Sequence, residues 1–281
     1  IIPVVDLALS NANIEKNQLD AIAYTRGPGL LGSLLVGSSF AKSLSMSLEI
    51  PLIEVNHMQA HLLCHFIENN GEKKTKFPFI GVNISGGHTQ IVLCHNYFEM
   101  ELIGETLDDS IGEAFDKCGK IIGFEYPAGP QIDKKSKEGD SKRFAFSLPK
   151  VDGLNFSFSG LKTNFRRTVE DGLNKNKNFI KIESNNLCAS LQSTIIKILS
   201  QKVSKAVNIT GVNNIVFGGG VSANSGIRDY FNNTKEKLNV FFSQNQYTTD
   251  NAAMIAMVGY LKFKEKKFSA LDLNSKARYK I

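Results

Sequence analysis

Short apolar runs alternate along this chain with longer segments whose apolar residues recur every three or four positions. The apolar runs predict buried β-strands, at residues 20–26, 51–56, 77–85, 86–94, 97–105, 213–218 and 239–244. The longer segments predict helices, at residues 27–48 (after an initial turn), 57–65, 110–123, 186–207 and 251–266. Strands and helices that alternate in this way indicate an α/β architecture.

The clearest helical pattern lies in residues 186–207. Leucine, isoleucine and valine recur there at every fourth position, which predicts a long amphipathic helix: Leu187, Leu191, Ile195, Leu199 and Val203. Such a stripe is typical of a helix face buried in a core, and it carries no functional signal. The strands at 77–85 and 86–94 are separated only by glycines, so we expect them to form a hairpin.

Three of the predicted strands end in glycine-rich turns: TRGPGLLGS, NISGGHTQ and VFGGGVSANS. Glycine lets a ligand approach the backbone, and exposed N–H groups near a helix start bind anions and phosphates. None of the turns has the P-loop pattern or a convincing dinucleotide-binding pattern. The turns Ser85–Gly87 and Gly218–Gly220 instead suit, by analogy, a cleft of the actin-like or sugar-kinase type, in which two lobes hold a nucleotide.

The stretch VNHMQAHLLCH places three histidines at steps of four: His57, His61 and His65. Residues four apart share one helix face, so His57 and His61 could bind a single ion. A pair of histidines on a solvent-exposed helix face would show the same spacing, and periodicity alone leaves both interpretations open.

The composition limits the class of protein only broadly. A length of 281 residues suggests about two domains. The net charge of +6 permits an anionic partner such as RNA, although the chain is rich in lysine and asparagine, which biased codon usage can also produce. No apolar run reaches the ~18 residues of a membrane span, and the four cysteines form no C-x-x-C pair, which argues against a zinc ribbon or a disulfide framework. The chain begins at Ile1 without a signal peptide, so we expect it to start inside a longer protein.

Eight stretches in order resemble the motifs of the tRNA adenosine threonylcarbamoyltransferase family, formerly described as O-sialoglycoprotein endopeptidases. They are TRGPGLLGSLLVG, NHMQAHLL, SGGHTQIV, GEAFDKCGKIIG, YPAGPQID, FSFSGLKT, FGGGVSANSGIR and TDNAAMIA. The resemblance implies a two-lobed actin-like ATPase or sugar-kinase-type fold. Residues 1–76 with the C-terminal helix 251–281 would form the first lobe, and residues 77–250 the second. It also implies transfer of a threonylcarbamoyl group from its adenylate to the N6 amine of the adenosine adjacent to the anticodon in tRNA.

The resemblance further implies a set of site residues. His57, His61 and Asp250 match the ligands of one divalent metal ion, iron or zinc. The residues that match substrate or nucleotide contacts are Asn83, Ile84, Ser85, Gly86, Gly87, Asp116, Gly129, Asp133 and Asn224. No catalytic residue is assigned. From the residues alone, Asp116 and Asp133 could also be solvated helix acids, and Asn224 could cap a helix.

The partners implied are tRNA, threonylcarbamoyl-adenylate and other proteins of the tRNA-modification complex. No membrane is implied, and the expected location is the cytoplasm or an organellar matrix. Lys162, Arg166 and Arg167, near FSFSGLKT, could contact RNA phosphates. One departure from the family pattern is the lack of an N-terminal strand hairpin of the GIETSCDET type. The first lobe is therefore expected to be incomplete and the chain, as written, to be a poor transferase.

Two other functions fit parts of the pattern. A zinc metalloendopeptidase would need H-E-x-x-H, but Met58 stands where the glutamate should follow His57, so this function is disfavoured. A non-catalytic, actin-like scaffold that only binds nucleotide is the second alternative, and the sequence does not exclude it.

Overall fold

The computed structural model describes residues 1–67, 74–235 and 237–281. The chain divides into two compact units. Unit 1 comprises Ile1–Asn70 and Asp250–Ile281, and unit 2 comprises Gly71–Thr249.

Unit 1 is built on two parallel strands, β1 (Ile22–Gly27) and β2 (Leu52–Asn56), in register from Ile22↔Leu52 to Thr25↔Val55. Helix α2 (Leu31–Leu48) connects them, and helix α3 (His57–Leu63) begins directly after β2. Helix α9 (Ala252–Lys264) returns from the far end of the sequence and packs on β1, β2 and α3. The remaining helical elements in the described part of this unit are α1 (Ile2–Ala12) and the 3₁₀ turns Lys16–Gln18 and Cys64–Phe66. Residues far apart in sequence therefore meet where α3 and α9 begin.

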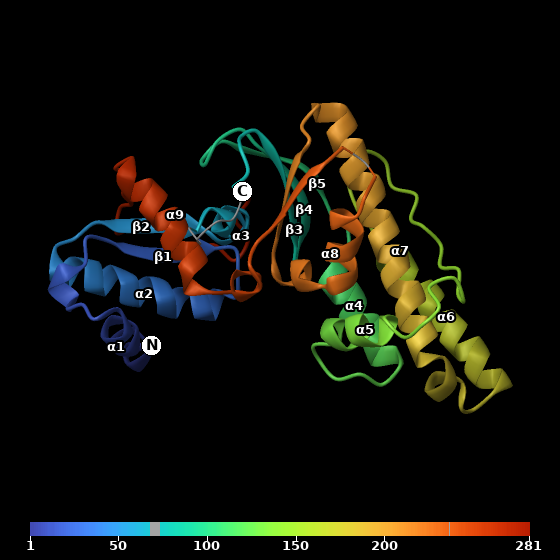
Figure 1. Cartoon of the computed structure of the whole chain (residues 1–281). Helices are drawn as coiled ribbons and strands as arrows, with labels where there is room; N and C mark the ends of the chain where they lie inside the picture. The colour runs from blue at the N-terminus through green and yellow to red at the C-terminus, as the bar shows by residue number, and fades with distance from the viewer. Residues whose placement is uncertain (68–73, 236) are drawn as a thin grey trace. The chain divides into compact units, whose positions relative to one another are not determined.

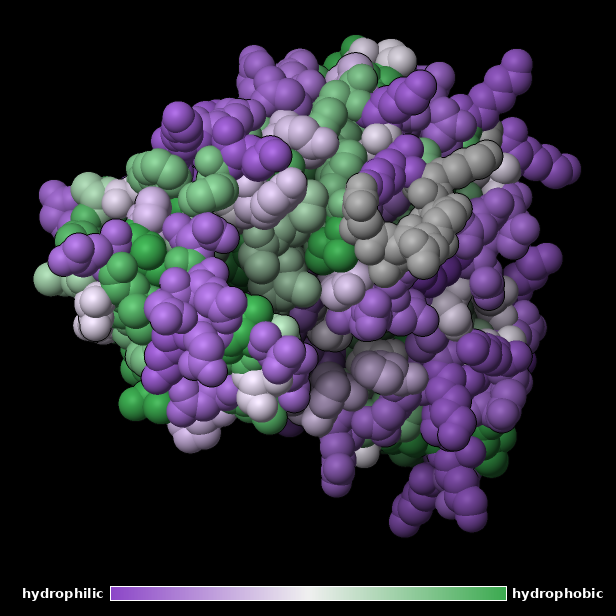
Figure 2. Space-filling model, turned by 60° about the vertical axis from the view of Figure 1, so that its left-hand side comes forward, coloured by the Kyte–Doolittle hydropathy of each residue, from purple (hydrophilic) through white to green (hydrophobic). Residues whose placement is uncertain are grey.

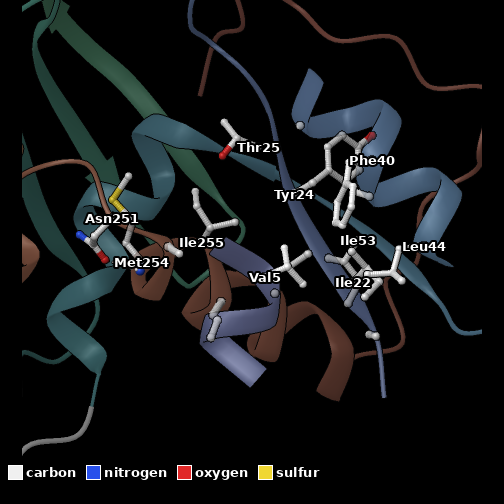
Figure 3. Close-up of a pocket in the computed structure, with 18 of the residues that line it drawn as sticks. Val5, Ile22, Tyr24, Thr25, Phe40, Leu44, Ile53, Asn251, Met254 and Ile255 are labelled. Carbon is white, nitrogen blue, oxygen red and sulfur yellow. Dashed lines mark hydrogen bonds between the residues drawn. The ribbon is translucent and has the colours of Figure 1, made fainter. Parts of the chain in front are cut away.

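An apolar hollow of about 1370 Å³ lies in unit 1. Figure 3 shows side chains of β1, β2 and α2 around it, among them Tyr24, Phe40 and Ile53, together with Met254 and Ile255 of α9. The Tyr24 hydroxyl is buried and has no hydrogen-bond partner among the described residues. Helix α1 has no buried residue, and α2 exposes several apolar side chains: Leu31, Leu35, Val36 and Met46. Figure 2 shows hydrophobic residues gathered over part of the face in view.

The last residues of the chain are bound to the strands of unit 1. The Lys276 amide donates to the Arg26 carbonyl at 2.9 Å, and the Gly29 amide donates to the Ala277 carbonyl at 3.2 Å. The Tyr279 hydroxyl donates to the Glu54 carboxylate at 3.2 Å. This irregular segment therefore takes part in the structure of unit 1.

Unit 2 contains a five-stranded mixed sheet in the order β5-β4-β3-β6-β7. Strands β3 (Phe79–Ile84), β4 (Thr89–Cys94) and β5 (Met100–Glu105) are antiparallel, and the β3–β4 hairpin predicted from the sequence is present. Strands β6 (Asn214–Gly218) and β7 (Asn239–Phe242) extend the sheet in parallel with β3. The predicted α/β architecture is confirmed.

Five helices pack on this sheet through one continuous apolar core. They are α4 (Ile111–Ile121), α5 (Gly129–Ser136), α6 (Ser159–Lys175), α7 (Phe179–Thr210) and α8 (Ser225–Asn232). The 3₁₀ turns Gly220–Ala223 and Asn245–Tyr247 complete the unit. Figure 1 shows α7 as the longest helix, running beside α6. Its leucine stripe is buried as predicted, since Leu187, Leu191 and Leu199 have no exposed surface.

The sequence patterns located most elements but not all. Helices α1, α5 and α6 were not predicted, and α7 begins several residues earlier than its apolar stripe suggested. The predicted helix 57–65 is too long: α3 ends at Leu63, and the half-buried His65 lies in a 3₁₀ turn. Within the described residues, no helix is long and apolar enough to cross a membrane.

Candidate metal centre and ligand-binding turns

Three side chains of unit 1 converge on one point: His57, His61 and Asp250. The Nε2 atoms of the two histidines lie 3.1 Å apart. One carboxylate oxygen of Asp250 lies 3.4 Å from Nε2 of His57 and 3.2 Å from Nε2 of His61. The structure therefore brings together the three residues that the resemblance pairs as metal ligands.

Local structure explains this convergence. The Asn56 side chain accepts hydrogen bonds from the amides of Met58 and Gln59, which caps α3 at its first turn. The fixed helix start puts His57 and His61 on one face, one turn apart. Asp250 lies just before α9. The Asn251 side chain caps the start of this helix by accepting a hydrogen bond from the Met254 amide. Two capped helix starts therefore bring the three donors to one place.

The electrostatic environment suits a cation. Hydrogen bonds from His57 and His61 hold the pKa of Asp250 well below its usual range. Burial lowers the pKa of His61, although its hydrogen bond to Asp250 opposes this shift. Both shifts favour the deprotonated forms, which are the forms that bind metal. His61 is 1% exposed whereas Asp250 is 80% exposed, so the cluster has one buried side and one side open to solvent.

The donor set fits a divalent metal with open coordination positions. Two imidazoles and one carboxylate are a common ligand set for zinc and for non-haem iron in catalytic sites. The two imidazole nitrogens already face the Asp250 carboxylate through hydrogen bonds, and one ion could take the place of these contacts. The Nδ1 atom of His61 is buried and finds no hydrogen-bond partner among the described residues, so this ring is held by packing and by the contacts of its Nε2 atom.

In unit 2, the turns that follow β3 and β6 lie side by side. The two strands are in parallel register, with Asn83 opposite Gly218 at their ends. Gly219 approaches the carbonyl of Ile84 so closely that a Cβ at this position would lie 2.5 Å from its oxygen. The two glycine turns identified in the sequence thus form one continuous edge of the sheet.

The Ser85–Gly87 turn rests on the start of helix α4. The hydroxyl of Ser110, the N-cap of α4, donates to the Gly86 carbonyl at 2.7 Å. The Gly112 amide donates to the Ser85 carbonyl at 3.2 Å, and a Cβ at Gly112 would lie 2.6 Å from the Gly86 α-carbon. Gly86 and Gly87 are exposed with open space beside them, whereas Asn83 and Ile84 are fully buried. A ligand at this edge would therefore meet the turn rather than the two strand residues.

The other predicted contacts already have structural partners. Asp116 accepts a hydrogen bond from the Ala128 amide at 2.8 Å, next to Gly129 at the start of α5. Asp133 accepts from the Ser225 amide and hydroxyl and from the Gly226 amide. Both acids are half-buried, so neither is simply a solvated helix acid.

Asn224 caps α8, as the residues alone suggested. Its Oδ1 accepts from the Ile227 amide at 2.9 Å, and its Nδ2 donates to Gln192 Oε1 at 2.7 Å. Asp133 and Asn224 therefore both hold the start of α8 immediately after the second glycine turn. A ligand at the start of α8 could therefore bind only to those atoms of Asp133 and Asn224 that these hydrogen bonds do not use.

Sequence reasoning missed two residues that shape this region. Asp108 accepts hydrogen bonds from the hydroxyls of Ser157 and Ser159 and from the amides of Phe158 and Ser159. It thereby caps α6 from a distance of about 50 residues, which no local pattern reveals. Ser110 could have been found, because SIGE has the S-x-x-E form of a capping box, and both of its hydrogen bonds are present.

The cations proposed to contact RNA lie on α6, a helix that the sequence patterns did not predict. Arg166 and Arg167 are exposed, and Lys162 is half-buried. Arg166 forms an ion pair with Glu170 at 2.9 Å, one helical turn away. Part of this charge is therefore already compensated within the helix.

Fold and site together define an α/β protein with paired glycine turns in one unit and a His-His-Asp cluster in the other. Residues 1–257 match the TsaD family, described as tRNA N6-adenosine threonylcarbamoyltransferase, and the chain belongs to this family.

A relative of that description from Christiangramia forsetii is 55% identical over 283 residues, which cover 100% of this chain and 83% of the relative. Another from Riemerella anatipestifer is 52% identical over the same shares of both chains. Among solved structures, full-length HypF in its phosphate- and nucleotide-bound form aligns with a TM-score of 0.66 at 15% identity. That alignment covers 95% of this chain and 50% of HypF, and it shows likeness of fold only.

Proposed function

We propose that this protein transfers the threonylcarbamoyl group of threonylcarbamoyl-adenylate to the N6 amine of the adenosine adjacent to the anticodon in tRNA. In this reaction the amine nitrogen forms a bond to the carbamoyl carbonyl carbon. The bond from that carbon to the phosphate oxygen breaks, AMP leaves, and the amine loses a proton. The observation that carries the proposal is that a chain of this family has its His57, His61 and Asp250 side chains at one point.

The three clustered side chains would hold one divalent metal ion, for which we propose iron or zinc. Such an ion, when bound, supplies a positive charge that can orient and polarise an oxygen of the substrate. The contribution of the chain is to hold the two imidazoles and the carboxylate at one point, with the pKa values of His61 and Asp250 lowered toward their metal-binding forms. The half-open environment of Asp250 leaves room for an oxygen ligand from outside the protein.

We place the adenylate on the edge formed by the two glycine turns of unit 2. The exposed backbone of Gly86 and Gly87 can approach a ligand closely, and the start of α4 lies directly behind that turn. Asp116, Gly129, Asp133 and Asn224 lie on the elements that follow, α4, α5 and the start of α8. This arrangement supports an actin-like nucleotide-binding fold. The likeness of the chain to nucleotide-bound HypF supports the same fold.

The required partners are tRNA and the adenylate, and we expect other proteins of the modification complex as well. The exposed apolar side chains of α2, which include Leu35 and Val36, support a protein partner on unit 1. The relatives reported above are bacterial, and a tRNA-modifying enzyme acts where tRNA is present. We therefore propose the cytoplasm as its location.

The test is direct transfer. Purified protein, with its metal and any partner proteins, is incubated with threonylcarbamoyl-adenylate and unmodified tRNA, and the tRNA nucleosides are analysed by mass spectrometry. We expect threonylcarbamoyladenosine to form with wild-type protein and to fall to background with Asp250→Ala. Product at the wild-type level in that variant would show that the cluster is not required.

The two alternatives give different outcomes. A nucleotide-binding scaffold would bind an adenylate analogue at equilibrium but yield no modified nucleoside under any condition. A metalloendopeptidase would cleave casein in a manner that a chelator abolishes. The second is disfavoured because Met58 occupies the position of the general base, and its side chain is buried in unit 1.

A further inference from the structure

Arg228 lies on the first turns of α8 and connects two pieces of backbone. Its Nε donates to the Ser222 carbonyl at 2.8 Å, and its Nη2 donates to the Ser243 carbonyl at 2.8 Å. The guanidinium also lies over the ring of Phe242, 4.9 Å from its centroid. One planar group therefore binds the turn before α8 and the chain just after β7.

The surroundings of Arg228 are unusual for a cation. The residue is half-buried, and no carboxylate among the described residues acts on its charge. Burial lowers the pKa of Arg228, and no acidic neighbour opposes the shift. Cations removed from water are normally paired, because desolvation disfavours the charged form. Here the guanidinium contacts two main-chain carbonyls and an aromatic ring instead of a carboxylate.

The first of these carbonyls belongs to the second glycine turn. Ser222 lies in the 3₁₀ turn that begins at Gly220, is fully buried, and has a hydroxyl with no hydrogen-bond partner among the described residues. Its amide donates to the Gly219 carbonyl at 2.9 Å. The position of Ser222 therefore fixes Gly219, which in turn packs against the backbone that leads into the Ser85–Gly87 turn.

We propose that Arg228 is a positioning residue for the adenylate: it holds the Gly218–Asn224 turn in its ligand-binding shape through the Ser222 and Ser243 carbonyls. The proposal rests on the proposed function. Arginine suits this role because its planar group directs several N–H donors along fixed lines. A lysine ammonium would keep the charge but could not reproduce the fork.

Lys202 on α7 offers a matched control. It too is a cation bound to main-chain carbonyls, those of Val151 and Gly153, both at 2.9 Å. Burial lowers the pKa of Lys202 as it does that of Arg228. Its two acceptors lie in the loop before α6, outside both glycine turns. Lys202→Met therefore removes a similar interaction without touching the proposed binding edge.

The experiment compares Arg228→Lys, Arg228→Met and Lys202→Met with wild type by steady-state transfer kinetics. For both Arg228 variants we expect KM for threonylcarbamoyl-adenylate to rise about tenfold or more while KM for tRNA stays within about twofold, since about 1.4 kcal/mol of lost positioning corresponds to a factor of ten. Lys202→Met should leave both KM values unchanged. If kcat of the Arg228 variants falls while both KM values stay unchanged, the role of Arg228 is merely structural and the proposal is overturned.

Hydrogen exchange provides a readout that does not depend on activity. Arg228→Met should reduce the protection of the Ser222 and Asn224 amides, which donate within the turn to Gly219 and Val221. Lys202→Met should leave this protection intact. If wild-type protein shows no transfer, the proposed function fails while exchange still decides whether Arg228 holds the turn. Unchanged protection in Arg228→Met would overturn the role of Arg228 whatever the activity.

Discussion

Gly219 lies against the carbonyl of Ile84, and this contact joins the two glycine turns of unit 2. A Cβ at Gly219 would lie 2.5 Å from the Ile84 oxygen, and the glycine adopts a φ of +87° that other residues rarely adopt. Two independent constraints, backbone conformation and space, thus require glycine at this position. Ile84 immediately precedes Ser85, so a displacement at Gly219 would move both turns.

We therefore predict that Gly219→Ala impairs transfer much more than Gly220→Ala. A Cβ at Gly220 would have its nearest neighbour, the Thr249 methyl group, at 3.8 Å, which is ordinary contact. Because a misplacement of about 1 Å can cost ~100-fold in rate, kcat/KM should fall by roughly that factor for Gly219→Ala. Steady-state transfer assays on both variants provide the measurement. Equal effects would mean that the close approach does not matter for catalysis.

Asp108 leads to a prediction about pH. Burial raises the pKa of Asp108, but hydrogen bonds from Ser157, Phe158 and Ser159 outweigh this effect, so that the net pKa is lowered. A carboxyl group with a lowered pKa in the folded state stabilises the fold above its unfolded pKa. That stabilisation is lost as the pH falls through the folded pKa.

Asp108→Asn keeps one acceptor oxygen but loses the charge, so it should lower the free energy of unfolding by about 1 kcal/mol at neutral pH, since hydrogen bonds to a charged group are the stronger ones. The difference from wild type should begin to shrink below about pH 4, where the carboxyl of the unfolded chain becomes protonated, and should vanish only below the lowered pKa of the folded state. Urea denaturation at pH 7 and at pH 3.5 measures both differences. A deficit that does not change with pH would show that the charge of Asp108 is unimportant.

Sequence patterns located the elements whose signals are local. The stripe through Leu187 and Leu199 predicted α7 because burial of one helix face dictates a period of about 3.6 residues. Glycine turns after β3 and β6 could be expected to meet because parallel neighbouring strands end at the same edge of a sheet. Helix α6 was missed because its polar residues dominate the stretch, and much of its start is stabilised by Asp108 from a distance.

The residues of the candidate site could likewise be predicted from the sequence only where their signal is local. The spacing of His57 and His61 is a local signal, but nothing local connects them to Asp250, which only the family resemblance supplied. A ligand contact of Asp133 stays a prediction, and no sequence pattern indicated that its carboxylate accepts hydrogen bonds from the amides at the start of α8. The position of Arg228 depends on Ser243, which lies 15 residues further along the chain. Interactions between segments distant in sequence leave no periodic pattern, so the structure was needed to find them.

Asn56 should affect metal binding without contacting the ion. Its Oδ1 caps α3, and its Nδ2 donates to the Lys280 carbonyl at 2.9 Å, so one side chain links the helix that carries both histidines to the C-terminal segment. Asn56→Ala loses both interactions and should weaken zinc affinity by about tenfold, within the range usual for groups that support metal ligands. Asn56→Ser keeps a capping oxygen and should lose less. Competition with a chromophoric chelator measures both affinities, and an unaltered affinity in Asn56→Ala would refute the link.

The metal centre itself gives the sharpest prediction. When zinc or ferrous iron binds, the Nε2 atoms of His57 and His61 and a carboxylate oxygen of Asp250 should each lie about 2.0–2.2 Å from the ion. His61→Ala and Asp250→Ala should each reduce the metal content from about one ion per chain to nearly none, because two remaining ligands bind too weakly. Asp250 is 80% exposed, so its removal leaves no cavity and tests the site without risk to the core. His65→Ala is the matched control, since this nearby histidine lies outside the cluster. Elemental analysis after gel filtration gives the metal content, and circular dichroism checks that each variant is folded. A full complement of metal in folded Asp250→Ala would mean that the ion is held elsewhere or that this carboxylate is no ligand.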